Sequence, residues 1–175
     1  MFRARTWLFA AVMSSAATSV PAQNPTSLTD AEIAHIVYIA GQIEIEYANL
    51  ALNKSSTASV RAFAIATLND HTAANKAALS SLAASNINPQ DNPISQSLAG
   101  AGTEHSQQLS QLSGAAFDKA YAENELAYHV LITGALETRL IPSTQNGQVK
   151  SLLQSELALF KQHQKDATQL VSQFK

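Results

Sequence analysis

Four long segments, following one another from Thr29 to the C-terminal end, carry apolar side chains at spacings of three and four residues. This spacing places the apolar side chains along one face of an α-helix. No segment shows the convincing alternation of apolar and polar residues that a half-buried β-strand requires. Because each amphipathic helix must bury its apolar face against another, the sequence predicts an all-α fold in which four helices form a bundle.

Local signals predict where these helices begin and end. The first begins with the capping box Thr29-Asp30-Ala31-Glu32, and it ends at Asn53 to Thr57, where a serine or threonine can cap the second helix. The second helix is expected to end near Asn86. The third runs from Gly114 to about Leu140, where Ile141-Pro142 is expected to stop it, because the residue before a proline avoids the helical conformation.

The connections between the helices predict the topology. The first two helices share a short turn, and so do the last two, which flank Pro142 to Gly147, so each pair is expected to be antiparallel. Residues 86–103 contain two prolines and a Gly-Ala-Gly segment and predict a long irregular crossover, with a short helical stretch before Gly114. One long crossover within four antiparallel helices is the pattern of a ferritin-like four-helix bundle.

The first 22 residues read as a cleaved export signal. Arg3 and Arg5 give a basic start, Trp7 to Ala17 is mostly apolar, and Val20-Pro21-Ala22 offers the small residues that a signal peptidase needs. The apolar stretch is shorter than the roughly 20 residues of a membrane-spanning helix, although an uncleaved anchor is the alternative. The sequence therefore predicts a signal peptide over 1–22, one helical domain over 23–175, and a periplasmic or secreted location.

Charge and composition exclude several functions. Removal of Arg3 and Arg5 from the 11 basic residues leaves 9 against 13 acidic ones, a net charge near −4, and there is no basic patch for a nucleic acid. The absence of cysteine excludes disulfides and thiol chemistry. No further apolar stretch is long enough to span a membrane. No glycine-rich phosphate loop or nucleophile elbow is present, and no motif indicates a protein partner.

Several acids and histidines fall on faces that should be buried. At about 100° per residue, Glu44 lies within the apolar face of the first helix, His71 within that of the second, and His163 with Glu156 within that of the fourth. A stripe beside the apolar face of the third helix carries three more such residues, and Asn124 is the polar residue at the centre of that face. The members of the stripe are Asp118, Glu125 and His129.

A buried, unpaired carboxylate costs several kcal/mol, so these side chains must bind an ion, meet water or satisfy one another. Carboxylates with imidazoles suit iron, manganese or zinc. The first interpretation is therefore a divalent transition metal in the bundle core. Its main ligands would be Glu44, His71 and His163, and Asp118 or His129 would supply another. The second is a structural hydrogen-bond network without a metal.

Two acid–histidine pairs near these residues are assigned other roles. Asp70 points about 100° away from its neighbour His71 and is expected to face a helix edge or solvent. Glu32 and His35 have the Glu-x-x-His spacing of di-iron bundles, but Glu32 already serves the capping box. Because no second Glu-x-x-His is present, the ligand set of a di-iron enzyme is incomplete. No catalytic residue is predicted, and an enzyme of this kind would be a metal-dependent redox protein.

Taken in order along the chain, the motifs resemble a bacterial family known as domain of unknown function 4142, whose members are exported and regarded as ferritin-like. The resemblance spans nearly the whole of residues 23–175. It rests on IEIEYANLAL (43–52), VRAFAIATLNDHTAAN (60–75), LSGAAFDKAY (112–121), His129 and LALFKQH (157–163).

The resemblance implies a set of polar positions that are typical of the family. Glu44, His71 and His163 were already selected by helical phase, and the chain departs from the family with Ala158 in place of a proline and Glu125 in place of an apolar residue. The positions implied are Glu44, Asp70, His71, Asp118, Tyr121, His129 and His163. The family has no settled activity. We therefore expect an exported helical-bundle protein that binds a metal ion, the alternative being a non-catalytic interaction or stress-protection module whose polar network is structural.

Overall fold

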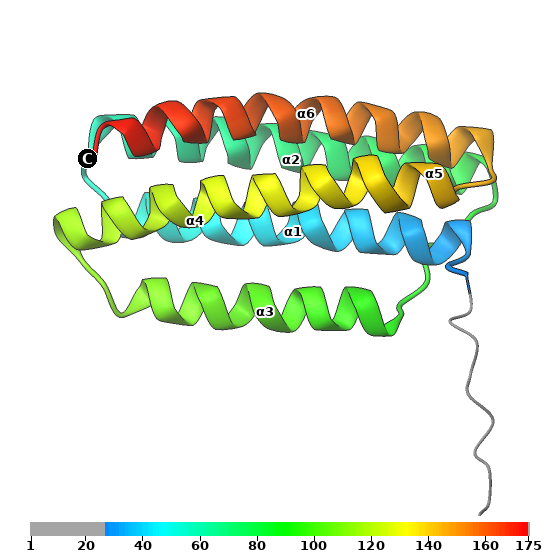
Figure 1. Ribbon diagram of the computed structural model, residues 1–175, viewed down its shortest axis with the longest axis horizontal. Coiled ribbons are helices and arrows are strands. Elements are labelled where there is room, and N and C mark those ends of the chain that lie inside the picture. Colours follow the sequence, from blue (N-terminus) through cyan, green and yellow to red (C-terminus); the bar gives the residue numbers. More distant parts are fainter. Residues whose placement is uncertain (1–26, 175) are drawn as a thin grey trace, which may run out of the picture.

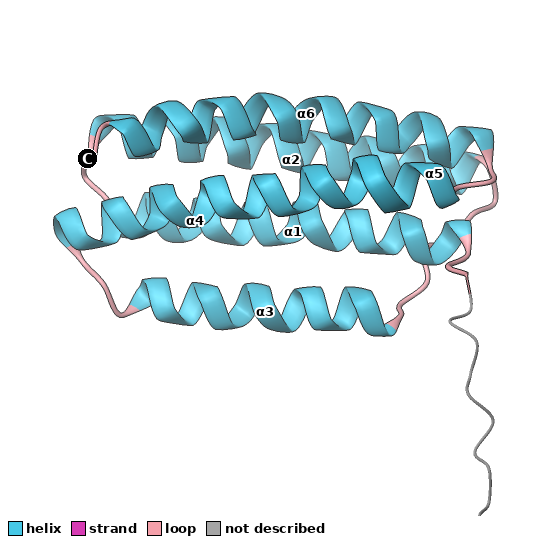
Figure 2. Ribbon diagram, viewed as in Figure 1, coloured by secondary structure: helices cyan, strands magenta, loops and turns pink. Residues whose placement is uncertain are grey.

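The computed structural model describes residues 27–174, and every regular element in that range is a helix (Figure 2). The predicted all-α class is therefore confirmed. Residues 1–22, where we predict the export signal, lie outside the described residues. The elements are α1 (Asp30–Lys54), α2 (Ala58–Ala84), α3 (Pro93–Ser110), α4 (Gly114–Ala135), the π-helix η1 (Leu136–Leu140), α5 (Ile141–Ser143) and α6 (Gly147–Ser172).

The four longest helices share one apolar core. Helices α1 and α2 pack as one antiparallel pair and α4 and α6 as the other, and α2 lies beside α6 (Figure 1). Most of the largest completely buried side chains come from α1, α4 and α6, and α2 contributes Leu82 and His71. They include Tyr47, Phe117, Tyr121, Leu153 and Phe160.

Helix α3 departs from the predicted irregular crossover. Residues 93–103, expected to be irregular, form most of an 18-residue helix that packs on the outer side of α1 (Figure 1). Asn92 begins this helix by accepting hydrogen bonds from the backbone amides of Ile94 and Ser95, and Pro93 occupies its first position, where no amide is needed. A Cβ on Gly102 would lie 2.7 Å from Ile43, so glycine allows α3 to approach α1 closely.

The third predicted helix also runs further than expected. The chain remains helical through Pro142 to Ser143, with a five-residue π-helical turn, Leu136–Leu140, between α4 and α5. Pro142 lies in the first turn of α5, where its missing amide costs no hydrogen bond within that helix. The predicted stop at Ile141-Pro142 is therefore wrong by about one turn of helix.

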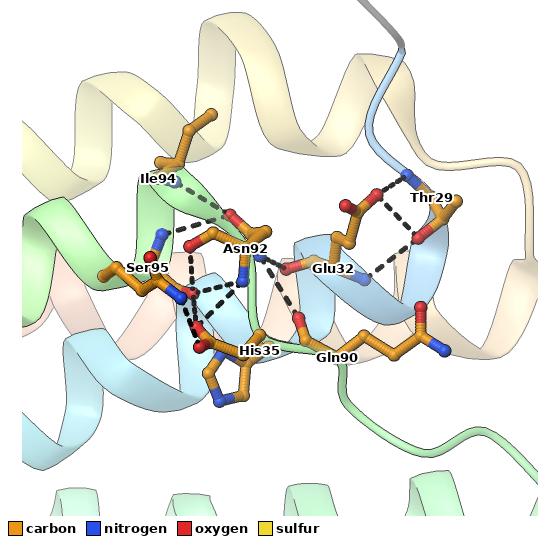
Figure 3. Close-up of polar contacts among 9 residues, drawn as sticks. Thr29, Glu32, His35, Gln90, Asn92, Ile94 and Ser95 are labelled. Carbon is orange, nitrogen blue, oxygen red and sulfur yellow. Dashed lines mark hydrogen bonds and ion pairs between the residues drawn. The ribbon is translucent and has the colours of Figure 1, made fainter.

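Polar side chains tie the helix ends together (Figure 3). The predicted capping box is present: Thr29 Oγ1 accepts from the amide of Glu32, while the Glu32 carboxylate accepts from the amide of Thr29 at 2.8 Å. The Asn92 side chain donates to the carbonyl of Glu32 at 3.2 Å, which attaches the start of α3 to the start of α1. The Asp30 carboxylate accepts from the amides of Gln145 and Asn146, which attaches the α5–α6 turn to α1. The register of the helices is thus set at their ends.

Within residues 27–174, no helix is both long enough and apolar enough to cross a membrane.

Candidate metal site

Three side chains from three helices converge near the middle of the bundle. Glu44 of α1, His71 of α2 and His129 of α4 each place one potential ligand atom within 4.8 Å of the other two. All three side chains are completely buried. We call Glu44, His71 and His129 the central triad. Glu44 and His71 lie near the midpoints of α1 and α2, and His129 lies in the second half of α4, within long helices whose packing fixes the backbone.

The polar atoms of the central triad are almost all without hydrogen-bond partners. Both carboxylate oxygens of Glu44 and both ring nitrogens of His71 have none, and neither does Nε2 of His129. Buried polar atoms in folded proteins are hydrogen-bonded in the great majority of cases. Each such atom left unpaired costs about 1–3 kcal/mol. The triad therefore gathers unpaired nitrogen and oxygen atoms from three helices.

The state of His129 is set by its neighbours. Its Nδ1 donates to the backbone carbonyl oxygen of Glu125 at 2.8 Å, because a carbonyl can only accept. This hydrogen bond fixes the tautomer that leaves Nε2 with a free lone pair. Burial lowers the pKa of His129 to about 4, and burial together with the charges of His163 and His129 lowers the pKa of His71 to about 3. Both rings are therefore neutral at pH 7, which is the form that binds metals.

Glu125 is a fourth completely buried polar side chain at this level of the bundle. Its Oε2 lies 3.8 Å from Nδ1 of His129, and Oε1 of Glu44 lies 3.5 Å from the same nitrogen. Burial raises the pKa of both carboxyl groups, and the charge of Glu125 raises that of Glu44 further. Two buried carboxylates this close favour protonation in the absence of a cation, and a bound cation would displace those protons.

His163 and Asp70 lie beside the triad rather than within it. The His163 ring centroid is 5.2 Å from that of His71 and 5.7 Å from that of His129. Its Nε2 lies 3.2 Å from Oδ2 of Asp70, whose side chain is 53% exposed. The structure therefore brings His163 to the edge of the site, while Asp70 faces the surface as its helical phase predicts.

Asp118 lies at one end of the bundle. Its carboxylate accepts a hydrogen bond from the hydroxyl of Thr57, the N-cap residue of α2. Eleven residues separate Asp118 from His129 on α4, or roughly 16 Å at ~1.5 Å per residue. The structure therefore does not bring Asp118 to the central triad, although the sequence proposes it as a ligand.

Glu32 and His35 do not contribute to the triad. Glu32 serves the capping box, as predicted, and Nδ1 of His35 lies 3.7 Å from Asp91. Neither residue belongs to the group that converges on Glu44.

The sequence prediction does not include the hydroxyl groups of Tyr47 and Thr67 in the site. The hydroxyls of Tyr47 and Thr67 are buried and have no hydrogen-bond partner, and the Tyr121 hydroxyl, at a position that the family resemblance implied, has none either. Burial, followed by the charges of Glu44 and Glu125, raises the pKa of Tyr121 well above its usual range. Thr67 precedes His71 by four residues and shares its helix face, a spacing that would have indicated it.

One divalent cation fits this donor set. Two carboxylates and two neutral imidazoles balance its charge and offer oxygen and nitrogen ligands. A tetrahedral ion with bonds of about 2.1 Å holds its ligand atoms about 3.4 Å apart. Because the triad atoms lie within 4.8 Å of one another, they must move together by up to about 1.4 Å. Side-chain rotation on fixed helices suffices for a movement of that size.

Comparison with known proteins shows that the chain matches one family. The sequence profile of the family Domain of unknown function (DUF4142) matches residues 15–170. No curated protein and no solved structure matches the chain significantly.

Proposed function

The chain belongs to the family Domain of unknown function (DUF4142), whose description names no activity, and we propose that it is a metal-binding protein with one divalent transition-metal site in the bundle core. The ligands are Glu44, His71 and His129, with Glu125 as the fourth. We assign no catalytic residue.

The observation that carries this proposal is the set of unpaired polar atoms on completely buried side chains. A structural network predicts that each histidine is held by an acid or a carbonyl. His129 has such a partner for one nitrogen only, and His71 has none. A cation held by the four ligands would instead use the free nitrogens and carboxylate oxygens together.

The types of ligand atom favour some metal ions over others. Imidazole with carboxylate suits Mn²⁺, Fe²⁺ and Zn²⁺, whereas Mg²⁺ and Ca²⁺ prefer oxygen ligands alone. The absence of cysteine removes the thiolates that select Cu⁺. We propose manganese, iron or zinc as the natural occupant.

The proposal includes a fold family and a location. Helices α1, α2, α4 and α6 form two antiparallel pairs joined by one long connection, which supports a ferritin-like arrangement with α3 added to the crossover. The basic and apolar start of the sequence supports export, with cleavage after Ala22. The mass of the protein recovered from a periplasmic fraction tests this, because cleavage leaves Gln23 as the first residue.

The metal proposal is tested by elemental analysis of untagged protein purified without chelator and then incubated with Zn²⁺, Mn²⁺ or Fe²⁺. We expect about one ion per chain in the wild type and loss of that ion in His71→Ala/His129→Ala. The matched control is His35→Ala/His105→Ala, which removes the same number of histidines away from the triad. The control should keep the metal.

Two results would count against the proposal. Equal and negligible metal in the wild type and the triad variant would favour the alternative, a structural polar network in a non-catalytic interaction or stress-protection module. Equal metal content in all three proteins would place the bound ion at another site.

A further inference from the structure

A metal bound by the central triad must cross a layer of protein, because its three side chains are completely buried. A cavity of about 260 Å³ lies between α2 and α6, near the start of α2 and the end of α6. Figure 1 shows these two helices side by side, with the end of α6 next to the start of α2. We call this cavity the port. It is lined by Ser59, Phe63, Ala66, His163, Asp166 and Leu170, among others.

The inner wall of the port is one side chain thick. His163 lines the port and its ring centroid is 5.2 Å from that of His71. Phe63 lines it too, and its ring centroid is 6.1 Å from that of His163 and 6.3 Å from that of His129. A change of rotamer at His163 or Phe63 would therefore connect the port with the triad.

His163 contacts the surface and the interior at once. Nε2 lies 3.2 Å from the exposed carboxylate of Asp70, whereas Nδ1 is buried and has no hydrogen-bond partner. Asp166, three residues after His163 on α6, lines the port and is half-buried. The Asp70 carboxylate thus lies against Nε2 of His163, Asp166 follows three residues later on α6, and Nδ1 is unpaired inside the protein.

A second cavity along the same two helices provides a comparison. It has a volume of about 300 Å³ and is lined by Ala74, Ala77, Leu152 and Glu156, among others. Its lining includes neither a member of the triad nor His163. Size therefore does not distinguish the two cavities, but contact with the rings around the triad does.

We propose that the port is the route by which a divalent metal reaches the central triad, with Asp70, Asp166 and His163 as its first ligands. This inference rests on the proposed metal site and adds how that site is filled. The two acids attract the cation to the port. His163 then passes it from the surface carboxylates to His71 and His129, on the far side of its ring.

The test measures the rate of Co²⁺ uptake by the full metal-free protein, from the absorbance of bound Co²⁺ after rapid mixing, and Kd by titration calorimetry. Asp70→Asn/Asp166→Asn should slow uptake about tenfold, the lower end of the ~10- to 1,000-fold range of electrostatic steering. The amount of Co²⁺ bound at saturation should stay at about one ion per chain, because the variant leaves the triad intact. The control Glu104→Gln/Glu123→Gln removes the same charge from the exposed α3–α4 side and should load at the wild-type rate.

A second pair of variants tests the route without changing charge. Ala66 and Ala77 are both exposed alanines of α2, and they line the port and the second cavity respectively. Ala66→Trp should block the port and slow uptake about tenfold at unchanged Kd, whereas Ala77→Trp should load at the wild-type rate.

The outcomes separate this inference from the proposed function. A wild-type protein that takes up no Co²⁺ would overturn the metal site itself. Normal binding by the wild type, with Ala66→Trp loading equally fast, would overturn the port alone. If Ala66→Trp is slow but the double asparagine variant is fast, the proposed role of the two acids is overturned and the route is supported.

Discussion

The partly exposed polar groups at the ends of the bundle and the buried ones in its middle are paired very differently. At the ends, both oxygens of Asp30 accept backbone amides, and the Lys54 ammonium donates to the carbonyls of Ser110 and Leu112. In the middle, the atoms of Glu44 and His71 have no hydrogen bonds. The same chain therefore satisfies its polar groups where they set helix register and leaves them open where three helices converge.

This difference indicates which polar groups serve the fold. A polar group paired at a helix end stabilises the fold by itself, whereas an unpaired buried one destabilises it until a ligand arrives. The two regions should therefore respond differently to metal, to substitution and to pH.

The largest expected effect is stabilisation by metal. If a metal binds only the folded protein, Zn²⁺ at 100 times its Kd adds about 2.7 kcal/mol to the free energy of unfolding. For a domain of this size that raises Tm by roughly 5–10 °C. Thermal unfolding followed by circular dichroism, with Zn²⁺ and with EDTA, measures the shift. His71→Ala/His129→Ala should show none, and a wild-type Tm that Zn²⁺ leaves unchanged would contradict the proposed site.

Two buried acids of α4 should respond to substitution with opposite signs. Glu125→Leu removes an unpaired buried carboxyl group, so the metal-free protein should gain stability, on the order of 1–4 kcal/mol. Asp118→Ala leaves the Thr57 hydroxyl without its acceptor and should cost about 1–3 kcal/mol. Urea unfolding in EDTA measures both changes.

The same two variants should separate in metal binding. Glu125→Leu should weaken Zn²⁺ binding, and Asp118→Ala should leave it unchanged, because Asp118 lies at the end of the bundle. If Glu125→Leu loses stability, the unpaired carboxyl group of Glu125 does not destabilise the metal-free protein. If Asp118→Ala loses metal, Asp118 contributes to the metal site as well as to the fold.

Glu156 gives a smaller effect that depends on pH. It is a buried carboxyl group in the wall of the second cavity, and burial raises its pKa from 4.5 to about 7. A raised pKa stabilises the folded protein below pH 4.5, and this contribution is lost as the pH rises through 7. Between pH 5 and 8.5 the difference in unfolding free energy should move in favour of Glu156→Gln by on the order of 2 kcal/mol. Urea unfolding of both proteins in EDTA measures it; parallel pH profiles would contradict the assignment.

The sequence predicted most of the helices and part of the site. Glu44, His71 and His163 were selected by helical phase alone, because α1, α2 and α6 keep a regular apolar face along their buried sides. The capping box at Thr29 was likewise predicted and is confirmed. Regular periodicity and local capping depend on nearby residues only, which is why a sequence can predict them.

The phase of α4 was misjudged for a physical reason. By its spacing Leu131 belongs to the predicted apolar face, but it is 59% exposed, and it draws the apparent centre of that face towards Asn124. The buried face is instead centred on Glu125 and His129, both 0% exposed. An exposed leucine cannot be distinguished from a buried one by spacing, so Glu125 was placed beside the core.

The register between the two helix pairs was also beyond prediction. The connection from Ser85 to Ser113 contains α3, and its path decides which level of α4 faces α1. Whether Asp118 or His129 of α4 lies beside Glu44 depends on which part of α4 faces α1. The Asn92-Pro93 start of α3 is a local signal that could have indicated the helix, since asparagine before proline is a favourable helix start.

That start gives the smallest predicted effect. Asn92→Ala removes the cap of α3 and its hydrogen bond to α1, and should cost about 1 kcal/mol. Because Asn92 lies near the start of α1 and the triad lies at its middle, the two contributions should add. The cost measured by urea unfolding should therefore agree within about 0.5 kcal/mol in Zn²⁺ and in EDTA. A cost that changes with metal would mean that α3 positions the triad, and the ends and middle of the bundle would then form one unit.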